Sequence, residues 1–106
     1  MSELITKIYE EYRNYPHDVS TIPLRQCYRK RWFYVYTSEN KIMISRARYH
    51  NESSQLKYDR VLDVANADKM FELYLRRKKD EMVSKEAGST TVNQVYWYGI
   101  FYDLKF

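Results

Sequence analysis

The chain has 106 residues, of which 44% are hydrophobic, 30% charged and 17% aromatic, and it contains 12 tyrosines and a formal net charge of +4. This length and composition predict one globular domain that spans residues 1–106. The two glycines, Gly88 and Gly99, are too far apart for a glycine-rich phosphate-binding or dinucleotide-binding loop, and the single cysteine, Cys27, excludes an internal disulfide and a zinc site built on a cysteine pair.

Four elements are predicted in the first half of the chain. Residues 2–15 carry apolar side chains at three- and four-residue spacing, which predicts an amphipathic helix that ends before Pro16. A loop is expected over residues 16–24, because a proline lies near each of its ends. Residues 27–37 are aromatic and β-branched and predict a strand, and a short turn leads into a second strand over residues 41–50. We expect these two strands to pair as a hairpin.

The second half is expected to add a strand, a helix and a final strand. Residues 56–64 favour a third strand, although a short helix fits the same residues. An apolar stripe predicts a helix over residues 67–87, followed by Gly88, where a left-handed helix end belongs. Residues 94–106 are dense in aromatic side chains and predict a last strand that bends at Gly99. The order α-β-β-β-α-β predicts an α+β fold, with an antiparallel sheet of about four strands and two helices on one face of it.

The positive charge is concentrated in about a third of the chain. Residues 19–51 hold seven Lys and Arg residues against one Glu, a net charge of +6, and the rest of the chain has a net charge of −2. Such asymmetry indicates an anionic partner. The charge lies beside Trp and Tyr residues of the predicted hairpin, and cations bind phosphate while aromatic rings stack on nucleobases.

We therefore predict a non-enzymatic binding protein for a phosphate-bearing ligand, either single-stranded nucleic acid or a nucleotide, at a basic hairpin over residues 25–50. The alternative for the aromatic residues is burial in the core, because Trp and Tyr are mostly buried in small domains. The arginines would contact phosphate and the aromatic residues would stack on bases. The predicted ligand-binding residues are Arg29, Arg31, Trp32, Tyr34, Arg46, Arg48, Tyr49 and His50.

A small metal-independent ribonuclease is a second hypothesis. Arg46, Arg48, His50 and Glu52 occupy alternate positions at the end of the second predicted strand. A histidine can move the proton of a ribose hydroxyl, and cations stabilise the charge that develops on the phosphate. The sequence identifies no partner that would orient His50, so an ordinary surface turn is the better explanation of the same residues.

A small regulator or inhibitor that binds a protein, of viral or mobile-element origin, is a third hypothesis. The predicted last strand has large aromatic side chains on both faces, and Tyr and Trp are enriched at protein interfaces. A partner protein or a second copy of the chain would then cover Tyr96, Tyr98 and Tyr102. The basic run at residues 76–79 is instead expected to be a solvated helix face, because acidic residues lie four positions away from it.

No apolar run approaches the ~18 residues that span a membrane. The first residues include Glu3, where a secretory signal has basic residues. We therefore expect a cytoplasmic protein that does not contact membranes, and the sequence predicts no metal ion or other cofactor.

Overall fold

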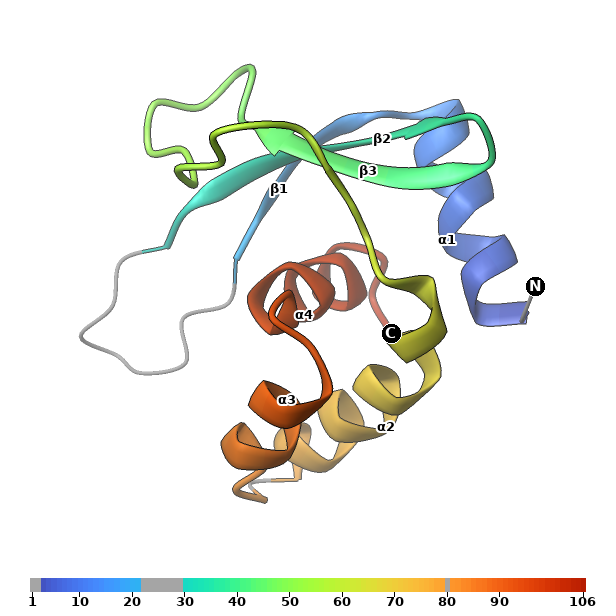
Figure 1. The fold of residues 1–106 in the computed structure, drawn as a ribbon, viewed down its shortest axis with the longest axis vertical. Helices are drawn as coiled ribbons and strands as arrows, with labels where there is room; N and C mark the ends of the chain where they lie inside the picture. The colour runs from blue at the N-terminus through green and yellow to red at the C-terminus, as the bar shows by residue number, and fades with distance from the viewer. Residues whose placement is uncertain (1–2, 22–29, 80) are drawn as a thin grey trace.

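The computed structural model describes residues 3–21, 30–79 and 81–106, with Ser84 described by its backbone alone. The sheet is antiparallel throughout, in the order β1-β2-β3-β4, and the helices lie on one side of it (Figure 1). The α+β class and the four-stranded antiparallel sheet are therefore as predicted. The elements are α1 (Glu3–Asn14), β1 (His17–Ser20), β2 (Trp32–Ser38), β3 (Lys41–Arg46), β4 (Arg60–Val61), the 3-10 helix η1 (Val64–Asn66), α2 (Ala67–Lys78), α3 (Ser84–Thr90) and α4 (Gln94–Asp103).

The predicted hairpin is formed by β2 and β3. Its turn holds Glu39 and Asn40 in the left-handed backbone region, with φ angles of 50° and 64°, which suits the twist of a two-residue hairpin turn. Val35 lies opposite Ile44, and both are fully buried beneath the helices. Because side chains alternate along a strand, the neighbouring residues point to the other face of the sheet.

β1 replaces part of the loop that was expected over residues 16–24, so that prediction is wrong for His17–Ser20. β1 pairs with β2 and places Val19 opposite Phe33, and both side chains are fully buried. A four-residue edge strand with one buried aliphatic side chain has too little alternation to be recognised locally. Its pairing with β2 is what stabilises it.

Other predicted elements are shorter than expected. β3 ends at Arg46 instead of residue 50, because the backbone N–H groups of Arg48 and Tyr49 donate to Asp18. The strand expected over residues 56–64 is reduced to the two residues of β4. The helix expected over residues 67–87 is divided into α2 and α3.

The C-terminal strand predicted over residues 94–106 is wrong, because Gln94–Asp103 form the helix α4. Four of its large side chains are almost completely buried: Trp97, Tyr98, Ile100 and Phe101. A helix that is buried on most sides has no polar face and therefore no recognisable apolar stripe. Local aromatic preference favoured a strand, and packing between the sheet and α2 decided otherwise.

Gly99 lies within α4 and allows this helix to lie directly on the sheet, instead of bending a strand. A Cβ atom at this position would lie 2.7 Å from the carbonyl oxygen of Ser20 and 3.1 Å from a ring carbon of Phe33. Real Cβ atoms essentially never approach that closely, so the close contact between α4 and β1 depends on the absence of a side chain at Gly99.

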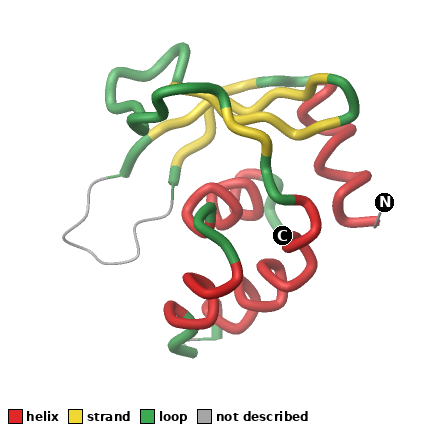
Figure 2. Tube along the Cα trace, viewed as in Figure 1, coloured by secondary structure: helices red, strands yellow, loops and turns green. Residues whose placement is uncertain are grey.

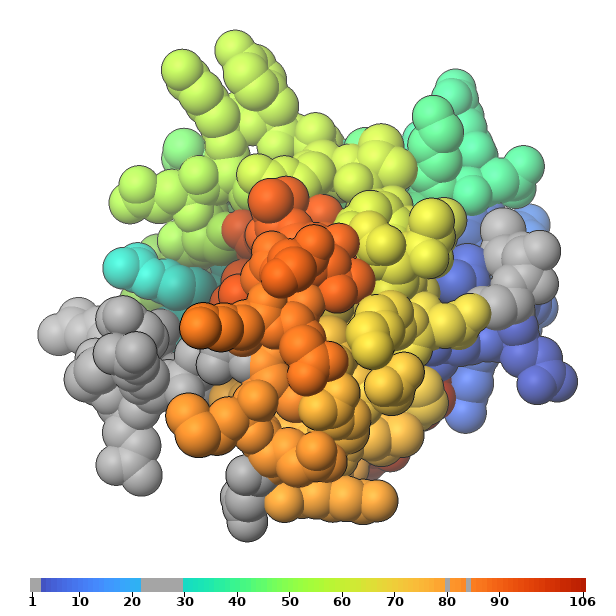
Figure 3. Space-filling model, turned by 60° about the horizontal axis from the view of Figure 1, so that its bottom comes forward, coloured from blue at the N-terminus to red at the C-terminus, as the bar shows by residue number. Residues whose placement is uncertain are grey.

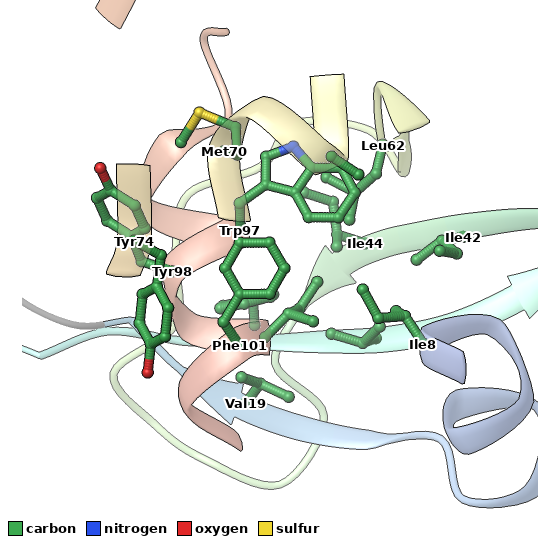
Figure 4. Close-up of a cluster of buried hydrophobic side chains, with 14 of the residues drawn as sticks. Ile8, Val19, Ile42, Ile44, Leu62, Met70, Tyr74, Trp97, Tyr98 and Phe101 are labelled. Carbon is green, nitrogen blue, oxygen red and sulfur yellow. The ribbon is translucent and has the colours of Figure 1, made fainter. Parts of the chain in front are cut away.

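The core fills the space between the sheet and the helices (Figure 2). Side chains from distant parts of the chain converge there (Figure 4), among them Ile8, Val19, Ile42, Ile44, Leu62, Met70, Trp97 and Phe101. The sheet contributes aliphatic side chains and α4 contributes aromatic ones. For the hairpin aromatics, the alternative of burial applies to Phe33 and Tyr34, which are 0% and 7% exposed, whereas Trp32 and Tyr36 are half-buried.

A half-buried carboxylate, Asp63, connects the helical elements. It accepts hydrogen bonds from the side chains of Asn66 (2.7 Å), Thr91 (2.5 Å), Asn93 (3.0 Å) and Trp97 Nε1 (3.0 Å). Burial raises the pKa of Asp63, but these hydrogen bonds outweigh it and the net pKa lies below its ordinary value. Asp63 thus ties η1 to α4 and to the segment that precedes α4.

The paired helices α2 and α3 occupy the centre of the view in Figure 3 and carry a network of opposite charges. Arg76 forms a two-pronged pair with Glu86 at 2.9 and 3.0 Å, and its Nε donates to Glu81 at 3.2 Å. The expected pair with Glu72 is also present, at 3.8 Å. This face is therefore compensated in charge, through the predicted pair with Glu72 and through Glu81 and Glu86, which the four-residue spacing did not predict as partners of Arg76.

Candidate functional site

The face of the sheet that is turned away from the helices, which we term the outer surface, gathers cationic and aromatic side chains. They come from residues at and before β2 and from the segment after β3. Ring contacts form two groups, Lys30–Trp32–His50 and Arg48–Tyr34–Tyr36–Tyr49. Asp18 links the two groups through its hydrogen bonds to His50 and to the backbone of residues 48 and 49. Five of the predicted ligand-binding residues meet here: Trp32, Tyr34, Arg48, Tyr49 and His50. Lys30 and Tyr36 join them.

Arg48 lies with its guanidinium over the Tyr34 ring and near that of Tyr36. Its guanidinium carbon is 4.2 Å from the ring centre of Tyr34 and 6.0 Å from that of Tyr36. Tyr36 in turn donates a short hydrogen bond to Asp59. Burial is the main cause that raises the pKa of Tyr36 to about 12, and the Asp59 carboxylate is the second. Among the described residues, no carboxylate forms an ion pair with Arg48. Arg48 is thus an exposed cation held on an aromatic support.

The backbone beneath this cation is anchored by Asp18 of β1. The Asp18 carboxylate accepts the N–H groups of Arg48 at 2.9 Å and Tyr49 at 2.7 Å, and Nδ1 of His50 lies 2.8 Å from its Oδ2. The side chain of Asp18 is 2% exposed. Burial raises the pKa of Asp18, but these three hydrogen bonds outweigh it and the net pKa lies below its ordinary value. Asp18 therefore remains a carboxylate and orients residues 48–50.

His50 is held by two contacts at once. Its ring stacks on Trp32 with 3.5 Å between ring centres and 7° between planes. Because an ionised carboxylate can only accept hydrogen bonds, Nδ1 of His50 carries a proton and donates a hydrogen bond to Oδ2 of Asp18. Among the described residues, Nε2 of His50 has no hydrogen-bond partner, and the side chain is 39% exposed. Lys30 Nζ lies 5.0 Å from the centre of the same Trp32 ring.

The other histidine, His17, also pairs with an aspartate, but both of its ring nitrogens are engaged. Nε2 lies 2.7 Å from Asp103 Oδ2, and Nδ1 lies 2.6 Å from the carbonyl oxygen of Tyr15. Tyr12 donates to the same Asp103 oxygen at 2.8 Å. This cluster links α1, β1 and α4 and leaves no ring nitrogen of His17 for a ligand, in contrast to His50.

Among the described residues, two of the predicted arginines, Arg31 and Arg46, form no ring contact or ion pair with the outer surface, and a third is not described. Arg46 was expected to share a face with Arg48, but its Nε donates to the carbonyl oxygen of Leu56 at 2.7 Å, and the chain turns after β3 so that Arg48 reaches the opposite face. Arg31 is exposed, and its backbone N–H donates to Thr21 Oγ1 at 3.0 Å. Arg29, like Cys27, lies outside the described residues.

Sequence reasoning missed Asp18, the residue that organises this site. Asp18 was assigned to a loop, so no pattern suggested that it would face His50 across the sheet. Tyr36 was placed on the correct face but not among the site residues, and Lys30 was noted only as part of the basic cluster. Alternation along β2 was the signal that could have included Tyr36.

The residues expected at a partner interface are separated by the folding of α4. Tyr98 is 1% exposed, and Arg77 lies over its ring with its guanidinium carbon 5.2 Å from the ring centre. Tyr96 is half-buried, packs edge-on against Phe33 and pairs with Ser54 through their hydroxyl oxygens at 2.7 Å. Tyr102 is 64% exposed. Of the three tyrosines, Tyr102 therefore presents the exposed ring.

A cavity of about 470 Å³ opens beside the outer surface, between β1, α2 and α4. Its lining includes Trp32, Tyr74, Lys78, Tyr102 and Asp103. Trp32 thus borders both this cavity and the outer surface. Within the described part of the chain, no group of three or more His, Cys, Asp or Glu side chains is placed to hold a metal ion.

None of the helices in the described residues is long and apolar enough to cross a membrane. No protein-family model, curated protein or solved structure matches this chain.

Proposed function

We propose that this protein binds single-stranded nucleic acid through the outer surface of its sheet. The observation that carries the proposal is Arg48, an exposed cation stacked on Tyr34 and anchored through its backbone by Asp18. A cation that is fixed before the ligand arrives loses little conformational entropy on binding, and guanidinium groups bind phosphate through paired hydrogen bonds.

The aromatic residues divide into two roles under this proposal. The rings of Trp32 and Tyr34 already contact His50 and Arg48, so they support these two side chains and do not offer open faces. Tyr49 is 77% exposed and is the ring we assign to stacking on a nucleobase. Lys30 and Arg48 would then contact the phosphates on either side of that base.

The test is a titration of fluorescently labelled single-stranded RNA and DNA of mixed sequence, followed by anisotropy at several salt concentrations. We expect log affinity to fall linearly with log salt, with a slope of about −0.7 for each phosphate contact. The Arg48→Ala variant should lose about tenfold in affinity, roughly 1.4 kcal/mol, and its slope should be shallower by about 0.7.

Arg13→Ala is the matched control, because Arg13 is exposed on α1, which packs against the other face of the sheet. It should leave both affinity and slope unchanged. Competition by a nucleoside monophosphate separates the two ligand sizes. Full displacement at low concentration indicates a nucleotide site, whereas weak displacement indicates a polymer. Absence of binding at low salt, or equal losses in both variants, would contradict the proposal.

A further inference from the structure

The arrangement around His50 goes beyond what phosphate binding requires. Asp18 is buried, and its carboxylate accepts hydrogen bonds from two backbone N–H groups and from Nδ1 of His50. Trp32 stacks against one face of the imidazole and limits its rotation. In the neutral ring the contact with Asp18 selects the tautomer with its proton on Nδ1, so that Nε2 is the basic nitrogen on the same surface as Arg48. A carboxylate that orients a histidine in this way is a common arrangement for general base catalysis.

Two groups contact His50 within the described part of the chain. They are the Asp18 carboxylate from β1 and the Trp32 ring from β2, with Lys30 placed against the same ring. Arg48 precedes His50 by two residues and is held separately on Tyr34. The mechanism requires that a phosphate bound by these cations reach Nε2, where the cations would stabilise the negative charge of a five-coordinate phosphorus transition state.

We propose that this protein cleaves single-stranded RNA without a metal ion, with His50 as the general base and Asp18 as its positioning residue; this rests on the nucleic-acid binding proposed above. Nε2 of His50 accepts the proton of a ribose 2′-hydroxyl, and the 2′-oxygen attacks the adjacent phosphorus. The O2′–P bond forms and the P–O5′ bond breaks. The imidazolium returns its proton through water to the leaving 5′-oxygen. The products are a 2′,3′-cyclic phosphate and a 5′-hydroxyl end, and no further reactant is consumed.

The experiment measures binding and cleavage on the same preparations of the full chain. Labelled RNA of mixed sequence is incubated with the protein in excess EDTA, and the products are separated by electrophoresis and identified by mass. The all-deoxy strand of the same sequence serves as a ligand that binds but lacks the 2′-hydroxyl. We expect cleavage of RNA to cyclic-phosphate ends and no cleavage of DNA.

His50→Gln keeps a polar side chain on Trp32 but removes the base. We expect it to slow cleavage by at least about a hundredfold, the lower end of what general base catalysis contributes, while RNA affinity changes little. His17→Gln is the matched control, because His17 is the other histidine and both its nitrogens are engaged within the fold. It should cleave at the wild-type rate, and thermal melting verifies that each variant is folded.

Asp18→Asn tests the positioning role by separating kcat from KM. With the carboxylate gone, Nδ1 loses the charged acceptor that orients the imidazole, so kcat for cleavage should fall while KM changes little. A merely structural role would weaken RNA binding and cleavage together. If Asp18→Asn does not fold, the His50→Gln variant carries the test alone.

The outcomes separate this inference from the proposed function. RNA that binds but stays intact overturns the cleavage proposal and leaves the binding proposal standing, whereas absence of binding overturns both. Cleavage that persists in His50→Gln, or that also degrades DNA, overturns the assignment of His50. Cyclic-phosphate products that depend on His50 support it.

Discussion

The Asp18 carboxylate and the His50 imidazole lie 2.8 Å apart although 32 positions separate them in the chain. The contact depends on β1, which brings Asp18 beside the start of β2, and on the turn after β3, which returns residues 48–50 to the same place. The same carboxylate holds that turn through two backbone hydrogen bonds. The outer surface is thus positioned by one buried acid at the edge of the sheet.

Two glycines in helices offer a matched pair for testing the packing of α4. Gly99→Ala would place Cβ 2.7 Å from the Ser20 carbonyl oxygen, and we expect a loss of about 1–3 kcal/mol in the free energy of unfolding, as for other overpacked sites. Gly88→Ala has no atom within 4 Å of the new Cβ and should be neutral or stabilising, by up to about 1 kcal/mol, because alanine favours helix. Urea denaturation measures both, and equal effects would show that α4 does not approach β1 this closely.

Removing Asp63 should loosen the junction between η1 and α4. Asp63→Ala leaves the Trp97 indole and the side chains of Thr91 and Asn93 without their acceptor, so we expect a loss of about 3 kcal/mol in stability. Asp68→Ala, at an exposed position in the first turn of α2, removes the same charge and should cost about 0.5 kcal/mol through the helix dipole. A difference of less than about 1 kcal/mol between the two variants would contradict the role of Asp63.

Stability should fall at acidic pH through Asp18 and Asp63, whose pKa values in the folded protein lie below the ordinary value of 3.8. A depressed pKa means that the unfolded chain binds protons more readily. The stabilisation is therefore fully present above the unfolded pKa of about 3.9 and is lost as pH falls through the lower folded pKa. Melting temperatures between pH 2 and pH 7 should show this decline. Asp18→Asn and Asp63→Asn should each flatten it, and an unchanged slope in both would refute the assignment.

Tyr49 belongs to the outer surface and Tyr102 to α4, and both are exposed. Replacing each in turn distinguishes RNA binding at the outer surface from RNA binding along the cavity beside α4. Tyr49→Ala should weaken binding to single-stranded RNA by about 1–3 kcal/mol, the value of one stacked base. Tyr102→Ala should not change it, because Tyr102 belongs to α4 and not to the outer surface. Anisotropy titration gives both affinities. If Tyr102→Ala weakens RNA binding more than Tyr49→Ala, the ligand lies along the cavity beside α4.

Several features could be predicted because they are local. Helix α1 has its apolar residues at helical spacing. Its observed range, Glu3–Asn14, therefore agrees closely with the helix predicted over residues 2–15. The hairpin follows from aromatic and β-branched residues around a turn that tolerates left-handed backbone at Asn40. Alternation along β2 correctly placed Trp32, Tyr34 and Tyr36 on the face opposite Phe33 and Val35, although Tyr34 is itself only 7% exposed and lies under the Arg48 guanidinium.

Other features were missed because their stability is not local. The aromatic residues of α4 prefer strands in isolation, but Trp97 and Phe101 gain more by packing between the sheet and α2. Arg46 and Arg48 were expected on one face because a strand alternates, and that rule fails once β3 ends at Arg46.

The amino-acid sequence by itself determined the α+β class, the basic and aromatic character of the hairpin and the concentration of charge between residues 19 and 51. These depend on composition and on spacing within a few residues. The tertiary structure alone decided that α4 is a helix, that His17–Ser20 is a strand and that Asp18 faces His50. Each of these depends on a partner far away in the chain, and the free energy of burial that such partners supply outweighs the small preferences of individual residues.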